Sequence, residues 1–409
     1  MTAAGARVPP EGIIACVATP SRQQAVARRR PRDRKQQILD AAARQFWQVG
    51  YHQVAMADIA EAVDIGASAL YRHFRGKQDL LVAVLDRTLV ELDRLTREPR
   101  DLAATVEALA RLALERREFG TLWGRDLASL PDDDRAALRS RLNAITVRVT
   151  KAVAAEFAHR ADEARLRTHA LYAVLSSPSR HHVELAPDDF VRLLTQAAAA
   201  VLRAPVPAHD VLPGAPKPGA APQLPASRRE AILAAAIRLF DRRGYSAVGI
   251  TDISAAASLS GPVIYRHFGG KTEILVAALT RGNEAIWLAL HQALAAADSV
   301  ADALDRVLDS YATLAAELPA TISVLLSEII SLEEADRERF RRYQQAYVHE
   351  WAVLLGRSRP ELAETDVRVL VHAALSVVNH FVGVHRLATR PHLASEAAAL
   401  ARAVLSTGA

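Results

Sequence analysis

A long internal repeat constrains the fold of this 409-residue chain more than any other feature of its sequence. Shifting the sequence by 194 positions aligns residues 34–85 with residues 228–279 without a gap, and 23 of these 52 positions are identical. The run Tyr-Arg-His-Phe occurs at 71–74 and again at 265–268, and a Gly-Lys pair follows it in both places. Because a chain of this length is expected to contain several domains, we predict two copies of one structural module.

A weaker repeat extends beyond the two modules. An offset of 203 pairs His169-Ala170 with His372-Ala373, and Val201-Leu202 with Val404-Leu405. Between the copies, residues 204–227 contain seven prolines in 24 positions. At ~3.1 Å per residue such a linker reaches roughly 70 Å, so the two units are able to meet within one chain.

Composition and patterning indicate a globular all-α protein. Half of the residues are apolar and 24% are charged, which is typical of a chain that buries a large core. Apolar residues recur at spacings of three and four, and no alternating run of Val, Ile and Thr is present. The formal charge of +5 is modest for this size, but residues 22–35 hold seven Arg or Lys against one acid, which predicts a basic arm before the first module.

Several other classes of protein fit the sequence poorly. The single cysteine, Cys16, excludes an internal disulfide and a cysteine-based metal site, and it favours a reducing, cytoplasmic setting. No run approaches the ~20 apolar residues that span a bilayer. We find no Gly-rich phosphate loop and no nucleophile elbow, and His372, His380 and His385 do not share one helical face. We therefore expect no enzyme activity, no cofactor, no metal and no membrane partner.

Each module begins with an amphipathic helix. Apolar residues at i, i+4 and i+8 form one stripe, and a glycine ends the helix. These positions are Ile38, Ala42, Phe46 and Gly50 in the first copy, and Ile232, Ala236, Phe240 and Gly244 in the second.

Two short helices follow, near residues 57–63 and 67–74 in the first copy. Leu70 and Phe74 lie one turn apart and are expected to face the core, whereas Ser68, Arg72 and Arg75 point away from it. Two short helices with a tight turn between them, the second presenting polar side chains, form the helix-turn-helix arrangement that places a recognition helix in the major groove of DNA.

Both copies resemble the DNA-binding domain of the TetR (tetracycline repressor) family. The first reads FWQVGY, DI and LYRHFRGK, and the second reads FDRRGY, DI and IYRHFGGK. The resemblance implies DNA contacts by the Tyr, the His and the Lys of each module, and the lysines also open a helix, where free N–H groups favour phosphate. Together with the other exposed positions, the candidate DNA-binding residues are Ala67, Ser68, Tyr71, Arg72, His73, Lys77, Gly261, Pro262, Tyr265, Arg266, His267 and Lys271.

Both modules also depart from the family pattern. Ala55 and Gly249 stand where a Ser or Thr usually caps the second helix, and Gly66 lacks the side-chain cap that Ser260 is able to supply. Asp64 suits a left-handed turn. Because each lost cap costs ~1 kcal/mol, either copy is expected to bind DNA more weakly than a typical member.

Two alternatives to this interpretation stay open at this stage. In the first alternative, the Tyr and the His of each recognition helix pack that helix against the first helix of the module and do not contact DNA. In the second, one or both modules have degenerated, and the chain acts as a ligand- or partner-binding protein. If both modules bind DNA, the half-sites should differ, since the recognition helices begin Ala67-Ser68-Ala69 and Gly261-Pro262-Val263.

The remainder of each unit is expected to be a helical partner domain. By resemblance, its last two helices, near 166–177 with 189–202 and 366–387 with 393–405, form a four-helix dimer interface below a pocket for a small-molecule effector that releases the repressor from its double-stranded operator. We predict a pseudo-dimer of the two halves of one chain; a homodimer carrying four modules is the alternative. The candidate pocket residues are Trp123, Arg125, Asp126, Glu328, Tyr347, Trp351, His372 and Asn379.

The sequence thus predicts six segments. They are a disordered basic arm at 1–32, a helix-turn-helix domain at 33–87, a helical ligand-binding and dimerisation domain at 88–203, the Pro-rich linker at 204–227, a second helix-turn-helix domain at 228–281 and a second helical domain at 282–409.

Overall fold

A computed structural model describes residues 31–98, 100–207, 225–384, 387 and 390–408 of the chain, and the side chains of 31–33 are not described. All regular structure in these residues is helical, as the sequence predicts. The predicted N-terminal arm, except for its last two residues, and most of the Pro-rich linker lie outside the described residues. Within the described part of the chain, no helix combines the length and the apolar character needed to cross a lipid bilayer.

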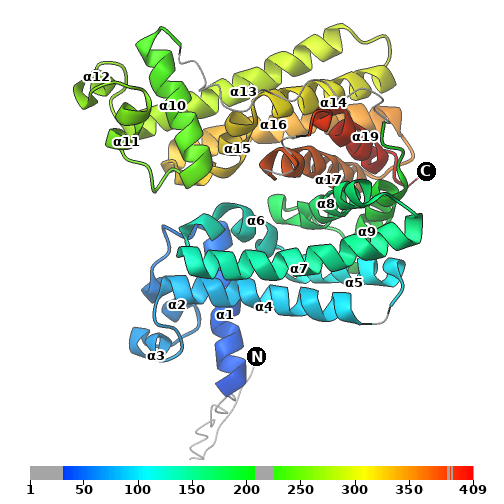
Figure 1. The fold of residues 1–409 in the computed structure, drawn as a ribbon, viewed down its shortest axis with the longest axis horizontal. Coiled ribbons are helices and arrows are strands. Elements are labelled where there is room, and N and C mark those ends of the chain that lie inside the picture. Colours follow the sequence, from blue (N-terminus) through cyan, green and yellow to red (C-terminus); the bar gives the residue numbers. More distant parts are fainter. Residues whose placement is uncertain (1–30, 99, 208–224, 385–386, 388–389, 409) are drawn as a thin grey trace, which may run out of the picture.

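The helices fall into two units of matching order (Figure 1). The first unit contains α1 (Pro31–Gln48), α2 (Met56–Ala62), α3 (Ala67–Tyr71), α4 (Lys77–Arg97), α5 (Leu102–Glu115), α6 (Glu118–Arg125), η1 (Leu127–Ser129), α7 (Asp132–Phe157), α8 (Ala161–Ser176), η2 (Ser177–Arg180) and α9 (Pro187–Arg203). The second contains α10 (Arg228–Arg243), α11 (Ile250–Ala256), α12 (Gly261–Tyr265), α13 (Lys271–Ala295), α14 (Val300–Glu317), α15 (Pro319–Ser327), η3 (Ile329–Ser331), α16 (Glu334–Ser358), α17 (Glu364–Gly383) and α19 (Leu393–Leu405).

The first helix of each module ends as its glycine predicts. Gly50 follows α1 with φ +105°, and Gly244 ends α10 with φ +75°. Glycine adopts this region without the steric cost that a Cβ atom brings. The chain therefore turns sharply into the loop before the second helix at the same point of both copies.

The two units pack against each other through the last helices of each. Helices α8 and α9 of the first unit lie against α17 and α19 of the second, and Figure 1 shows these four helices on the right, where the two units meet. Their inward faces are mainly apolar, although His169 of α8 meets His380 of α17 there, and they join a single hydrophobic core that runs from α5 and α9 into the second unit. The predicted intrachain pseudo-dimer is thus the arrangement of this fold.

Candidate nucleic-acid interface

The helix α3 of the first module has one buried face and one exposed face. Leu70 and Phe74 are buried in the module core, as predicted. Tyr71 is 54% exposed, and Ser68 and Arg72 are exposed as well. The tyrosine therefore does not pack α3 against α1, and the polar face is available to an external partner.

The second module repeats this division. Ile264 and Phe268 are buried under α12, and Tyr265 is 60% exposed. The predicted contacts Pro262 and Arg266 are exposed. The other predicted residues in and just after these two helices differ between the copies: Ala67 and His73 are exposed, whereas Gly261 and His267 are half-buried.

The turn between the second and third helices has the same backbone form in both copies. Asp64 has φ +53° and Ser258 has φ +57°, so the left-handed turn expected at Asp64 is confirmed. Such values cost a non-glycine residue energy, and Asp and Asn tolerate them best. The turn in the second module is therefore the more strained of the two.

The helix caps differ from the sequence prediction in two ways. The missing hydroxyl before α2 and α11 is partly offset, since Asp58 Oδ2 accepts a 2.7 Å hydrogen bond from the Ala55 N–H, and Asp252 Oδ2 accepts an equal one from Gly249. This is the reciprocal half of a capping box. The predicted cap by Ser260 is wrong, because its side chain makes no capping hydrogen bond to α12.

Both predicted DNA-contacting lysines are bound to their own module. Lys77 Nζ donates to the carbonyl oxygens of His52 and Val54 at 3.3 and 3.0 Å, and it lies 4.7 Å from the ring centroid of Tyr51. Burial lowers the pKa of Lys77. The ammonium group therefore holds the loop after α1 against α4, and its contact with phosphate stays a prediction.

Lys271 has the same arrangement in the second module. Its Nζ donates to the carbonyl oxygens of Tyr245 and Val248 at 3.0 and 2.9 Å, and it lies 4.1 Å from the Tyr245 ring centroid. The contacts with the corresponding carbonyls of Val54 and Val248 and with the corresponding rings of Tyr51 and Tyr245 are shared by both copies, which indicates a structural role that both retain.

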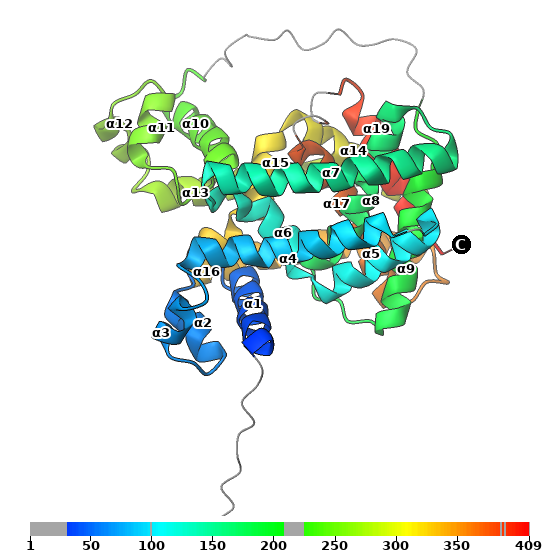
Figure 2. The same ribbon diagram turned by 60° about the horizontal axis from the view of Figure 1, so that its bottom comes forward.

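The two recognition helices lie toward the same end of the molecule. In Figure 1, α3 and α12 both occupy the left side, one below and one above the line between the units. Figure 2, turned by 60°, again places both modules on that side, away from the packed helices α8, α9, α17 and α19. A single partner molecule on that side is therefore able to contact both recognition helices.

Three of the predicted pocket residues lie at the junctions between modules and partner domains. Arg125 Nη2 donates to the Phe46 carbonyl at 2.6 Å and pairs with the buried Asp126 at 2.7 Å. Glu328 holds the corresponding position in the second unit, where Ser331 Oγ donates to it at 3.0 Å. Burial raises the pKa of both carboxyl groups. These residues join elements rather than line a cavity.

Four more predicted pocket residues lie in the second unit's core or at the interface. Tyr347 and Trp351 pack edge to face with neighbouring rings. Asn379 Oδ1 accepts a 2.7 Å hydrogen bond from the Tyr311 hydroxyl, and His372 stacks on His181 of the first unit with centroids 4.4 Å apart.

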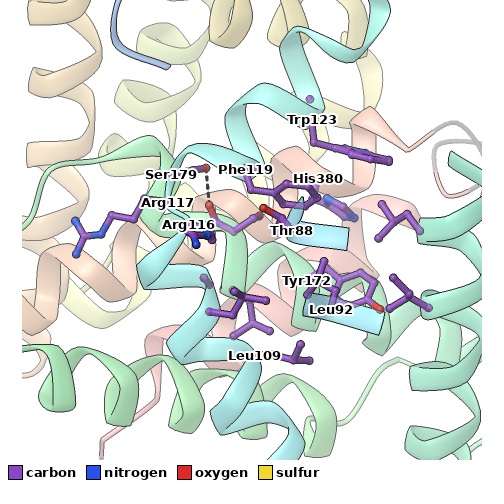
Figure 3. A pocket seen from close by; sticks show the side chains of 18 of the residues that line it. Thr88, Leu92, Leu109, Arg116, Arg117, Phe119, Trp123, Tyr172, Ser179 and His380 are labelled. Carbon is purple, nitrogen blue, oxygen red and sulfur yellow. Dashed lines mark hydrogen bonds between the residues drawn. The ribbon is translucent and has the colours of Figure 1, made fainter. Parts of the chain in front are cut away.

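A cavity of about 210 Å³ lies in the first unit. Of the eight predicted pocket residues, Trp123 alone lines it. Figure 3 shows Trp123 beside Phe119, His380 and Tyr172. Two further lining residues are not predicted from the sequence: Arg180, in the short turn η2, and His380, which comes from the other unit. The spacing of residues within one helix carries no signal for either position.

Comparison with known proteins agrees with the geometry of the two modules. The family described as "Bacterial regulatory proteins, tetR family" matches residues 38–84 and 232–278. The chain is 40% identical over 67 residues to the HTH-type transcriptional activator FasR of Mycolicibacterium smegmatis, covering 16% of this chain and 31% of FasR. It is 47% identical over 49 residues to the HTH-type transcriptional repressor ComR of Escherichia coli, covering 12% of this chain and 23% of ComR. The chain thus spans less than a third of either relative.

Among solved structures, the chain is similar to the TetR family transcriptional regulator PfmR from Thermus thermophilus, with 27% identity and a TM-score of 0.39. The match covers 45% of this chain and 98% of that protein.

Proposed function

The chain belongs to the TetR family of bacterial regulators, as a tandem of two family units, and from this premise we propose that it is a repressor that binds one DNA operator with both modules and is released by a small molecule. The observation that carries the proposal is the exposure of two recognition helices at the same end of one chain.

The pseudo-dimer supports binding to an asymmetric operator. Two helix-turn-helix modules of a dimer bind half-sites about one DNA turn apart, near ~34 Å. The exposed positions differ between the copies, with Ser68 in α3 and Pro262 in α12. One chain is therefore expected to recognise two half-sites of different sequence, whereas an ordinary homodimer reads two identical ones.

Direct contacts between the cavity and the first module support release by a ligand. Trp47 Nε1 on α1 donates a 3.0 Å hydrogen bond to the carbonyl of Ser179, and Ser179 lines the cavity. Helix α6 contributes Phe119 to the cavity wall and ends at Arg125, which holds the Phe46 carbonyl. A ligand that moves η2 or α6 would thereby reorient α1, and a change in the spacing of the two modules weakens binding of DNA.

The test is footprinting of the purified chain on DNA from its own genomic neighbourhood, with Tyr71→Ala and Tyr265→Ala as module variants. We expect protection of two unlike half-sites by one chain, loss of one half-site in each variant, and affinity that falls steeply with salt. In cells, deletion of the gene should raise expression of an operator-linked reporter.

The matched control is Tyr343→Ala, because Tyr343 is an exposed tyrosine on α16, outside both modules. This variant should keep the full footprint. Equal, full footprints from all three variants would contradict DNA contact by Tyr71 and Tyr265, and the absence of any footprint from the parent chain would show that the modules do not bind DNA. Two chains on one operator would contradict the pseudo-dimer. A fall in reporter expression after deletion would indicate an activator.

A further inference from the structure

The cavity of the first unit has an apolar wall and an unusual distribution of charge. Helices α4 to α8 contribute most of its lining, including Leu92, Leu109 and Phe119 (Figure 3). Three arginines also line it. Arg116 lies 3.5 Å from Asp40, and the Arg117 guanidinium lies 5.0 Å from the centroid of the Phe190 ring. Arg116 therefore pairs with an acid, whereas Arg117 contacts an aromatic ring and interacts electrostatically with Glu184.

Arg180 differs from the other two arginines. Its guanidinium forms no ion pair with a carboxylate of the described residues, and it interacts electrostatically with the Tyr311 hydroxyl and with His380, both of the second unit. The Arg180 side chain is exposed and lines the cavity, and the atoms packed around it lower its pKa. An arginine at an apolar cavity that has no acid of the protein as partner is able to form charge-assisted hydrogen bonds with an anionic ligand.

Two further groups make the site depend on both units. His380 on α17 of the second unit lines the cavity, and its Nε2 lies 3.1 Å from Nδ1 of His169. The buried Tyr172 hydroxyl also lines the cavity and makes no hydrogen bond of standard geometry in the described part of the chain, although Thr146 lies near it. The cavity thus places Arg180, which has no acid partner among the described residues, beside His380 in a mostly apolar wall.

We propose that this cavity binds an amphipathic monoanion, an apolar chain or ring that ends in a carboxylate, with the carboxylate paired to Arg180. The proposal rests on the proposed function, since this ligand would be the effector. Its apolar part replaces water along α4 to α8, and burial of that surface supplies most of the affinity. Arg180 then selects the acid over the alcohol of the same length.

The second unit is filled where the first unit is hollow. Tyr311, Tyr347 and Trp351 are buried there in mutual ring contact, and Trp287 packs edge to face on Tyr347. These rings come from α13, α14 and α16, the counterparts of the cavity-forming helices α4, α5 and α7. We therefore expect one ligand per chain, and a ligand effect that enters through the first unit alone.

The experiment measures binding of decanoate and decanol to the full chain by titration calorimetry, below the concentration at which either aggregates. Decanoate should bind once per chain and more tightly than decanol. Arg180→Gln should weaken decanoate roughly 10- to 100-fold, as expected for loss of charge-assisted hydrogen bonds, and leave decanol unchanged. Arg180→Lys keeps the charge and should retain part of the preference for the acid.

The matched control is Arg139→Gln, an exposed arginine on α7 outside the cavity lining, which should bind both probes as the parent chain does. Equal affinity for decanoate and decanol, no effect of Arg180→Gln, or two ligands per chain would overturn the proposal. Operator binding is measured in a separate arm. Decanoate that binds without changing operator affinity leaves this site intact and contradicts release by the ligand, whereas a chain that binds no operator contradicts the proposed function itself.

Discussion

Neighbouring residues of α3 have opposite environments, so a substitution at one is expected to change stability and a substitution at the other to change DNA recognition. Leu70 is fully buried, and Tyr71 next to it is 54% exposed. Leu70→Ala removes packed methyl groups and leaves a cavity, so we expect it to lower the free energy of unfolding by about 2–5 kcal/mol. Tyr71→Ala should change that free energy by no more than about 0.5 kcal/mol and still abolish protection of one half-site. Urea denaturation and footprinting of both variants measure the two effects.

The second module supplies the internal control for this pair. Ile264→Ala and Tyr265→Ala repeat the two substitutions in α12, where burial and exposure have the same pattern. The stability cost should again fall on the buried residue. A large stability loss from either tyrosine variant would mean that the exposed ring packs on the module, which is the alternative that the sequence left open.

The sequence predicts the residues of the two modules well because their geometry is local. A stripe at i, i+4 and i+8, a glycine after the helix and a short turn specify which side chains face inward, and Phe46, Gly50 and Leu70 lie where the pattern places them. The contacts of the lysines are harder to predict from the sequence, because Lys77 donates to the carbonyl oxygens of residues 52 and 54, in a loop whose path depends on tertiary packing. The lining of the cavity is the hardest part to predict from the sequence, because Arg180 and His380 come together there only when the two units pack against each other.

At the scale of elements, one side-chain hydrogen bond connects the first module to the cavity. Trp47 on α1 donates to the Ser179 carbonyl, next to Arg180. Trp47→Phe keeps an aromatic ring and removes the donor, so the module should still fold and bind DNA. We expect decanoate to bind this variant normally and to shift its operator affinity less than in the parent chain. Operator titrations with and without decanoate measure the coupling directly.

The comparison variant for this coupling is Trp287→Phe, a ring on α13 that packs with His291 and Tyr347 in the second unit. It makes the same chemical change without a link to η2. An unchanged decanoate effect in both variants would show that α1 does not carry the signal, and would leave the Arg125 contact of α6 as the remaining connection.

At the scale of the whole molecule, two pairs of histidines cross the interface between the units. His169 lies against His380, and His181 stacks on His372. Burial lowers the pKa of His169 to about 4 and that of His380 to about 3. Burial likewise lowers the pKa of His372 to about 4 and that of His181 to about 2. All four are therefore neutral at neutral pH, which allows them to lie within an apolar four-helix core.

Stability of the pseudo-dimer should consequently fall with acid. In the unfolded chain these histidines take up protons near pH 6.5, whereas the folded chain resists protonation until about pH 4. Between these limits the unfolded state binds more protons, so the contribution of these histidines to the free energy of unfolding is constant above about pH 6.5 and declines as the pH falls toward 4. Replacing one pair, as His169→Gln with His380→Gln, should reduce this slope, and His349→Gln, at an exposed position on α16, should not. Urea midpoints measured from pH 7 to 4.5 test this, and parallel curves for the parent chain and the paired variant would mean that the interface histidines do not govern its sensitivity to acid.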